Sequence, residues 1–184
     1  MEPTEIREFA DRLKEANEER TGESLKTISL AISILAVFVA MVTVLGHRSH
    51  TRAILMQSRA ADQWNQYQSK KIRMDDLSST VVVLGTQPTI DAAKTAATIA
   101  DFKIHIDKWE HELPEEEAIA HAYEAAGEHA ESQADRYDLG EALLQISVVL
   151  SSVTLFTRNR TYFFLGLAIG AAGLITAASA LLVK

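Results

Sequence analysis

Two long stretches of the sequence contain no charged side chain, and their length limits the possible folds more than any other feature. Neither residues 28–46 (ISLAISILAVFVAMVTVLG) nor residues 161–183 (TYFFLGLAIGAAGLITAASALLV) contain Asp, Glu, Lys or Arg. An α-helix rises about 1.5 Å per residue, so about 20 apolar residues cross the hydrocarbon core of a bilayer. The sequence therefore predicts a transmembrane helix over each stretch.

A third apolar run lies just before the last one. Residues 142–157 (ALLQISVVLSSVTLFT) contain one amide, Gln145, and only residues 158–160 (RNR) separate this run from the final stretch. Two helices joined by so short a link must be antiparallel, and arginines favour the headgroup level of a membrane. We therefore predict a membrane hairpin with its turn at the bilayer surface.

Charge is concentrated outside these runs. Residues 1–27 contain eight acidic and five basic side chains, residues 47–138 contain sixteen and ten, and residues 139–184 contain one and three. The segment before the first run is acidic and no small-x-small cleavage pattern follows it, so we expect a retained helix rather than a signal peptide. The chain has no cysteine, which excludes disulfides and thiolate chemistry and leaves the redox compartment open.

These features predict an all-α integral membrane protein with three transmembrane helices and a long, coiled-coil-like helical stalk between the first and second. The expected segments are an N-terminal amphipathic helix (1–27), a first span (28–46), an extramembrane helical domain (47–138), a second span (139–157), a short turn (158–160) and a third span (161–184).

Membrane orientation rests on basic residues near the span ends. Lys14, Arg20, Lys26, Arg158 and Arg160 lie on one predicted face, and Arg48, Arg52, Arg59, Arg136 and Lys184 lie on the other. The counts are equal, but long segments weigh less than short ones. We therefore favour a cytoplasmic N-terminus.

Helical spacing predicts which faces pack outside the membrane. Gly22 is the expected end of the N-terminal helix, and Pro114 is expected to begin a third extramembrane helix after Gly85 and Pro88 separate the first two. The four predicted packing faces are Ile6, Phe9, Leu13 and Ala16; Ala53, Met56, Ala60, Trp64, Tyr67, Lys71 and Met74; Ile90, Ala93, Ala97, Ala100 and Ile104; and Ile119, Tyr123, Ala126, Ala130, Ala134 and Tyr137.

The charges of the extramembrane segment favour a folded-back arrangement. Residues 47–77 contain six basic and three acidic side chains, whereas residues 78–138 contain four and thirteen. Exposed ion pairs contribute only about 0.2–1 kcal/mol each, so this attraction guides the pairing more than it stabilises it. Alanine-rich faces bury little area, which favours association with further copies or with other proteins.

One helix face has the composition of a metal site. Glu117, His121, Glu124 and Glu128 follow at steps of four, three and four, and imidazole and carboxylates bind divalent metals. The alternative is a solvated acidic face that contains one histidine. We favour the alternative, because a glutamate-rich helix produces this spacing by chance and no second ligand set is evident, so no metal and no cofactor is expected.

Two further groups of residues suggest contacts rather than chemistry. His47, Arg48, His50 and Arg52 follow the first span, where they are expected at the membrane interface together with Arg158 and Arg160; a pH-sensing role for the histidines is the alternative. The residues expected to form protein contacts are Trp64, Tyr67, Tyr123, Tyr137 and the small-residue face Gly166, Gly170 and Gly173, which permits close helix packing.

No pattern predicts an enzyme. No ionisable residue lies inside a predicted span, which disfavours an ion pathway or a proton relay. The sequence lacks a Walker loop, a zincin motif, a GxSxG elbow and a Rossmann glycine set. The acidic balance disfavours nucleic acid as a partner, and no small-molecule substrate is indicated.

The chain resembles the bacterial domain-of-unknown-function family numbered 4337, which consists of small predicted membrane proteins. The resemblance rests on residues 46–73 (GHRSHTRAILMQSRAADQWNQYQSKKIR), with Asp62, Gln63, Trp64, Tyr67, Gln68 and Lys70 as its pattern, and on residues 142–174. It implies an architecture and a bacterial inner membrane, and it implies no reaction.

The sequence thus favours a non-catalytic membrane scaffold or an accessory subunit of a larger membrane complex, which associates with itself or with other subunits through the stalk and the small-residue membrane faces. Residues 47–77 and 115–138 are the expected interaction surface. Two alternatives remain: a homo-oligomeric channel lined by Ser and Thr of the second span, here Ser151, Ser152 and Thr154, and a metal- or pH-responsive sensor that uses His121 or His47 and His50.

Overall fold

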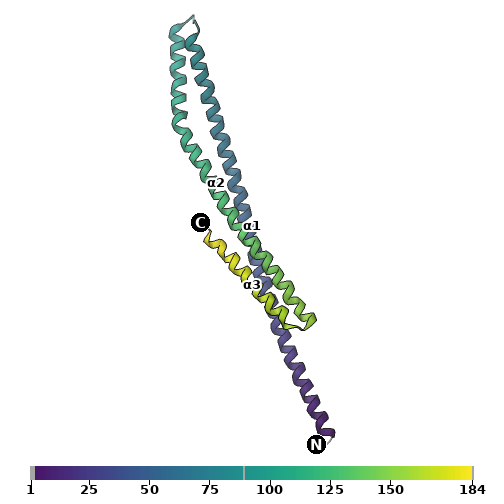
Figure 1. Ribbon diagram of the computed structural model, residues 1–184. Helices are drawn as coiled ribbons and strands as arrows, with labels where there is room; N and C mark the ends of the chain where they lie inside the picture. Colours follow the sequence, from purple (N-terminus) through teal and green to yellow (C-terminus); the bar gives the residue numbers. More distant parts are fainter. Residues whose placement is uncertain (1–2, 89, 184) are drawn as a thin grey trace. The chain divides into compact units, whose positions relative to one another are not determined.

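The computed structural model is helical over almost all of the residues that it describes (Figure 1). It describes the backbone of residues 3–88 and 90–183 and the side chains of residues 25–88 and 90–183. The elements are α1 (Pro3–Thr86), α2 (Ala92–Thr157), α3 (Arg160–Ser179) and a short 3₁₀ turn (Ala180–Leu182). No strand occurs in this part of the chain, and the predicted all-α fold class is confirmed.

Three helices are long and apolar enough to cross a membrane. The described parts of these helices are Leu25–Thr86, Ala92–Thr157 and Arg160–Leu182, and each contains a window with the hydropathy of a membrane span. The prediction of three membrane-spanning helices is therefore confirmed by length and composition.

Two predicted helix ends are wrong. α1 continues through Gly22, and α2 continues through Pro114, so the extramembrane residues form two long helices rather than three. Pro114 cannot donate a backbone hydrogen bond, and its ring clashes with the preceding turn of the helix. These two effects bend a helix but do not always end it. α2 bends within its teal to green part (Figure 1). The predicted break between Gly85 and Pro88 is correct, because α1 ends at Thr86. The predicted N-terminal face of Ile6, Phe9, Leu13 and Ala16 lies outside the described side chains.

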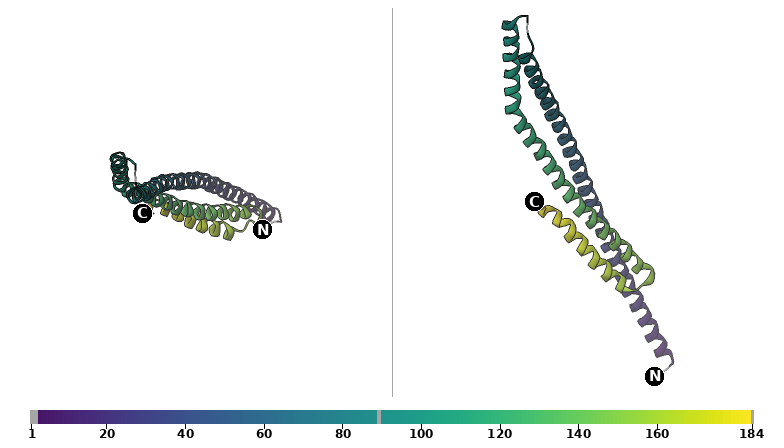
Figure 2. Two further views of the ribbon diagram at one scale, coloured as in Figure 1. Left: turned by 90° about the horizontal axis from the view of Figure 1, so that it is seen from above. Right: turned by 45° about the horizontal axis from the view of Figure 1, so that its top comes forward.

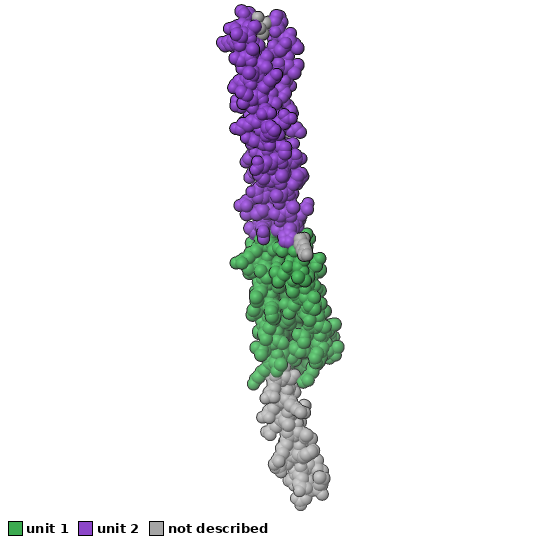
Figure 3. Space-filling model, turned by 90° about the vertical axis from the view of Figure 1, so that its left-hand side faces the viewer, with its two compact units in different colours: residues 1–49, 132–184 green, residues 50–131 purple. Residues whose placement is uncertain are grey.

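The chain divides into two compact units (Figure 3). Unit 1 contains residues 1–49 and 132–184, and unit 2 contains residues 50–131. Unit 2 is an antiparallel hairpin made of the second part of α1 and the first part of α2. Each unit is described separately below.

Unit 1 is a bundle of three helices in which α3 turns back beside the end of α2 (Figure 2). Its core contains Leu35 and Val42 from α1, Tyr137 and Leu144 from α2, and Ala177 from α3. Leu144 is completely buried. The helices therefore meet through a narrow core of small and branched side chains.

The outer surface of unit 1 is strongly apolar. Large side chains within the apolar windows are half or more exposed, including Leu30 at 62%, Val37 at 59%, Phe164 at 64% and Ile175 at 72%. Soluble proteins rarely expose so many large apolar groups together, whereas lipid solvates them well. This surface is the one expected of helices that contact hydrocarbon.

The turn between α2 and α3 is even shorter than predicted. Only Arg158 and Asn159 separate the two helices. Arg158 has a left-handed backbone (φ 54°) that ends α2, and the Asn159 side chain caps α3 by accepting a hydrogen bond from the Thr161 N–H at 3.0 Å. Both arginines, Arg158 and Arg160, are exposed at this end of unit 1.

Candidate functional site

The two arms of unit 2 pack along a continuous heptad seam. The buried and half-buried positions of α1 alternate steps of three and four residues, which is the spacing of a coiled coil. They are Ala53, Met56, Ala60, Gln63, Tyr67, Lys70, Met74, Leu77, Val81 and Leu84, with the half-buried residues Trp64, Ser78 and Thr80 beside them. The predicted stripe is correct except at Lys71, which is exposed; Lys70 takes its place in the seam.

The seam of α2 differs from the predicted one. Its seam positions are Thr95, Ile99, Phe102, Ile106, Trp109, Leu113, Glu116, Ala120, Tyr123, Gly127 and Ala130, and the half-buried residues beside them are Thr98, Glu112, Glu124, Ala126 and His129. The face predicted to pack between residues 90 and 104 is wrong, because Ile90, Ala93, Ala97, Ala100 and Ile104 are all exposed. Bulky side chains bury more apolar area than alanine, so Phe102 and Trp109 occupy the contact instead.

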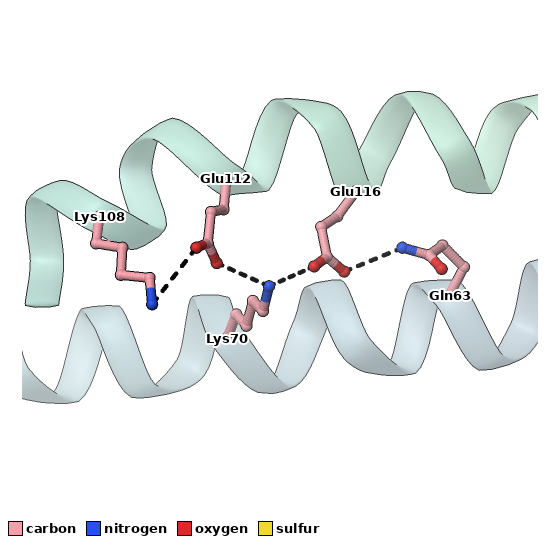
Figure 4. Close-up of polar contacts among 5 residues, drawn as sticks. All are labelled: Gln63, Lys70, Lys108, Glu112 and Glu116. Atoms are coloured by element: carbon pink, nitrogen blue, oxygen red, sulfur yellow. Dashed lines mark hydrogen bonds and ion pairs between the residues drawn. The ribbon is translucent and has the colours of Figure 1, made fainter.

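A lysine and two glutamates join the arms near the middle of the seam (Figure 4). Lys70 Nζ lies 2.9 Å from Glu112 Oε2 and also contacts Glu116 Oε1. Gln63 Nε2 donates to the second oxygen of Glu116 at 3.0 Å, and Lys108 Nζ lies 3.7 Å from Glu112. Polar pairs at core positions of a coiled coil fix register, because a slipped register leaves them without partners.

A second cross-arm contact is centred on Trp64. Its indole Nε1 donates to Glu124 Oε1 at 2.8 Å, and the other carboxylate oxygen lies 2.8 Å from His121 Nδ1. The Trp64 ring meets Tyr67 and His121 edge to face, with centroids 5.5 and 5.2 Å apart. Each such aromatic pair contributes about 0.5–1.5 kcal/mol beyond area burial. Trp64 and Tyr67 are therefore packing residues within one chain.

These contacts shift three ionisation equilibria. The hydrogen bond from Lys70 lowers the pKa of Glu112, and hydrogen bonds from Trp64 and then His121 lower the pKa of Glu124. Hydrogen bonds to Glu116 and Glu112 raise the pKa of Lys70. A carboxyl group whose pKa is lowered on folding stabilises the folded state above pH 4.5, the unfolded value, and this stabilisation is lost as the pH falls through the folded pKa. A lysine whose pKa is raised on folding stabilises the folded state at lower pH, and this stabilisation is lost only as the pH rises above 10.5.

We therefore expect the pairing of the two arms to weaken in acid. The thermal midpoint of the detergent-solubilised protein, followed by circular dichroism, should fall as the pH drops below about 4.5. Between pH 5 and pH 9, ionisation of these three groups should change the midpoint little. The matched variant Glu112→Gln/Glu124→Gln should show a smaller fall over the same acid range. Equal acid dependence in both proteins would show that these two carboxylates do not stabilise the arms through their charge.

The four candidate metal ligands do not converge. Glu124 accepts a hydrogen bond from Trp64 and contacts His121, while Glu117 and Glu128 are exposed and take no part in this contact. Across residues 25–88 and 90–183, no group of three or more His, Asp or Glu side chains is arranged to hold a metal ion. The His121 face functions in the structure as part of the cross-arm contact.

The two predicted tyrosine contacts lie in different units. In unit 2, Tyr123 is half-buried, with the Arg59 guanidinium 6.0 Å from its ring centroid. In unit 1, Tyr137 is 6% exposed and belongs to the core. Both side chains therefore pack within one chain.

The small-residue face of α3 is the close contact of unit 1. A Cβ on Gly166 would lie 2.6 Å from Ser151 Oγ, and one on Gly170 would lie 2.5 Å from Ser147 Oγ. A Cβ on Gly173 would lie 2.9 Å from the backbone oxygen of Gly140. The three glycines thus bring α3 against α2 of the same chain.

Two hydroxyls of the second span, those of Ser147 and Ser151, lie in this contact. Ser147, Ser151 and Thr154 are almost completely buried, and their side-chain oxygens have no hydrogen-bond partner. Ser152 donates to the backbone oxygen of Val149 in its own helix. Sequence reasoning did not single out Ser147, although its spacing of four residues from Ser151 places both on one helix face.

The predicted interface residues lie where α1 leaves its apolar window and where α2 meets α3. His47 and Arg48 are exposed in unit 1, as are Arg158 and Arg160, and His50 and Arg52 are exposed in unit 2.

Lys70 is the functional residue whose role the sequence reading missed. A strict alternation of three and four residues begun at Ala53 passes through Gln63, Tyr67 and Lys70, and so selects Lys70 over Lys71.

The chain belongs to the family described as Domain of unknown function (DUF4337), whose model matches residues 24–183. This match confirms the family to which residues 46–73 and 142–174 show a resemblance. A comparison with curated proteins and with solved structures finds no match.

Proposed function

We propose that this chain is a non-catalytic membrane scaffold or accessory subunit, which associates with itself or docks on a larger membrane complex. The proposal places unit 1 in the bilayer and gives unit 2 the task of making protein contacts. Lipid is the first partner, and further copies or other subunits are the second.

The observation that supports this function most is the surface of unit 2. Its polar and aromatic contacts are used to hold its own arms together, yet large apolar side chains outside the seam stay exposed. Ile54 and Ile72 are each 67% exposed, Leu55 is 47% and Val82 is 65%. Each square ångström of apolar surface removed from water stabilises a contact by about 25 cal/mol, so such groups favour a protein partner.

The channel alternative depends on hydroxyls of the second span. Ser151 is buried against Gly166 of α3, and Thr154 is buried within the same chain, so neither lies on a face that a second copy could meet. This arrangement supports the scaffold over the channel. The sensor alternative requires ligands around His121, and the engagement of Glu124 by Trp64 supports a packing role there.

We further propose that the protein lies in a bacterial inner membrane with a cytoplasmic N-terminus. The family resemblance supports the membrane, and the short arginine turn supports the orientation, because charges of short loops weigh most.

Native mass spectrometry of the detergent-solubilised full chain tests the scaffold function. We expect a discrete oligomer, or a stable complex with another membrane subunit. A chain that is purely monomeric and free of partners in native membranes and in mild detergent would contradict the proposal.

Ion flux separates the scaffold from the channel. We expect liposomes containing the oligomer to retain an ion gradient as well as liposomes without protein. Flux that rises with protein content would favour the channel.

A further inference from the structure

The two helices of the unit 2 hairpin carry opposite charges on their flanks. On α1, every seventh residue from 52 to 73 lies just before a seam position, and three of these four residues are arginines. Positions that directly flank a coiled-coil seam carry the charges that choose its partners. All four side chains are exposed, and we call this set the arginine edge: Arg52, Arg59, Gln66 and Arg73.

The flank of α2 has the opposite composition. Every seventh residue from 110 to 131 lies just after a seam position, and each of these four residues is a glutamate. Glu124 is half-buried and the other three are exposed. We call this set the glutamate edge: Glu110, Glu117, Glu124 and Glu131.

The two edges lie on opposite faces of the hairpin. The glutamate edge faces the same side as Trp64, which directly follows a seam position of α1 and donates to Glu124 at 2.8 Å. Each arginine precedes a seam position instead, and the Arg59 guanidinium lies 6.0 Å from the centroid of the Tyr123 ring. Across residues 25–88 and 90–183, no arginine of this edge forms an ion pair. The two edges therefore do not neutralise each other within one chain.

We propose that the arginine edge of one copy packs against the glutamate edge of a second copy, so that copies stand side by side in one membrane. The inference rests on the proposed scaffold function and deepens it by naming a second copy as the partner. Because the edges lie on opposite faces, each copy can contact two neighbours. Head-to-tail contacts of this kind build rings or open rows.

The charges of neighbouring copies match in height. The hairpin places Gly127 beside Met56, because a Cβ on Gly127 would lie 3.6 Å from Met56 Cβ. Equal steps in opposite directions from this pair give residues at one level, since both helices rise equally per residue. Copies anchored in one bilayer stand at the same height, so the same pairs come level between copies. These pairs are Arg52 with Glu131, Arg59 with Glu124, Gln66 with Glu117, and Arg73 with Glu110.

Other pairings of the two faces are unfavourable. Copies that met through their glutamate edges would bring carboxylates together, and copies that met through their arginine edges would bring guanidinium groups together. Like charges across a contact are a common means by which a coiled coil rejects a wrong partner. The edges therefore favour the head-to-tail arrangement over a two-fold dimer, in which each edge would meet its own copy.

The charges next to the edges limit the contact. Asp62 lies on the outer side of the arginine edge and comes level with His121 of the second copy, which is a compatible pair. Asp76 comes level with Asp107, which is a repulsive pair. We therefore expect the contact to extend from residue 52 to residue 73 of α1 and to end there, over about 32 Å at 1.5 Å per residue.

The contact should depend on the membrane and on salt. Exposed ion pairs are individually weak, but copies confined to one bilayer meet at a high effective concentration. The screening length falls from about 30 Å at 0.01 M to about 3 Å at 1 M ionic strength, so high salt should weaken the contact. We expect it to form in membranes of full-length protein and to weaken on dilution in detergent.

Cysteine crosslinking in membranes tests the register, since the chain contains no native cysteine. Two full-length versions with tags of different size are co-expressed, one with Gln66→Cys and the other with Glu117→Cys. A short thiol-specific crosslinker should join them into a heterodimer. Gln66→Cys alone should give no homodimer, because residue 66 meets residue 117 and not itself. The matched control replaces Gln66→Cys by Gln68→Cys, on the opposite flank of α1, and should give at least about tenfold less heterodimer.

Charge reversal tests the contact itself. Arg73→Glu in both chains should lower the crosslink between residues 66 and 117 by about threefold to tenfold, and Arg73→Glu/Glu110→Arg should restore it. Lys71→Glu makes the same charge change on the opposite flank of α1 and should leave the crosslink unchanged. These are exposed helical positions, so an unchanged thermal midpoint confirms that each variant folds.

Three results would each overturn the proposal: equal crosslinking through residues 66 and 68, a crosslink that Arg73→Glu does not lower, or adducts only with a foreign protein. Failure of this contact is distinguishable from failure of the scaffold function. If the edges are not the contact, native mass spectrometry still detects an oligomer or complex, whereas a partner-free monomer in membranes contradicts both.

Discussion

Replacing Gly173 by leucine should destabilise unit 1 by at least about 2–3 kcal/mol. A Cβ at this position would lie 2.9 Å from the Gly140 backbone oxygen and 3.1 Å from the Leu144 backbone nitrogen. Backbone atoms cannot rotate away as side chains can, so α3 would have to move off α2. Unfolding of the purified protein by titration with a denaturing detergent, followed by circular dichroism, measures the loss.

Gly85→Ala is the matched control for this substitution. Nothing lies within 4 Å of a Cβ at Gly85, and the residue is helical. Alanine in a helix is favoured over glycine by about 0.5–1 kcal/mol, so this variant should be as stable as the parent or slightly more so. If Gly173→Leu were tolerated as well as Gly85→Ala, the close contact of α2 and α3 would be incorrect.

Leu113→Ala should have the largest effect in unit 2, at roughly 2–4 kcal/mol. Leu113 is 7% exposed and is the largest buried aliphatic side chain of a hairpin whose other buried positions are mostly alanine. Truncation leaves a cavity that the surrounding side chains can fill only in part. Because domains are only marginally stable, this loss should lower the thermal midpoint of the full chain clearly.

Ile72→Ala tests whether burial is the cause. Ile72 is 67% exposed in the same unit, so its truncation should change stability by no more than about 0.5 kcal/mol. Equal losses from the two truncations would contradict the assigned seam.

The membrane helices were the part of the fold that the sequence could predict. A stretch without charge over the length of a bilayer has few alternatives, because backbone groups in lipid must be paired within the helix. The arginine turn was likewise predictable, since residues 158–160 leave no room for anything but a hairpin. Its detailed form, with Arg158 in a left-handed conformation, was not.

The seam of α2 was not predictable from spacing alone. Residues 90–104 have the correct periodicity for packing, as do residues 95–109 on the opposite face. Periodicity identifies an apolar face but does not choose between two such faces. Side-chain size decides the choice, because Phe102 and Trp109 bury more area against α1 than alanines do.

Spacing alone also fails to identify the polar residues that pack in the middle of the helical hairpin of unit 2. The predicted stripe placed a lysine one position later, at Lys71, because it took a step of four residues from Tyr67. The structure places Lys70 within the seam, where two glutamates of α2 compensate for its partial burial. A cross-arm partner of this kind is invisible until the register of the hairpin is known.

The central claim is that three helices of this chain cross a membrane, and cysteine accessibility tests it most directly. In the cysteine-free chain, single cysteines are placed at Asn159, in the short turn, and at Ser69, in the helical hairpin. Two more are placed at Val37 and Ile175, within the apolar windows. In intact, sealed vesicles, a membrane-impermeant maleimide should label the first two from opposite sides and neither of the last two. Rapid labelling at Val37 or Ile175, or labelling of Asn159 and Ser69 from the same side, would contradict it.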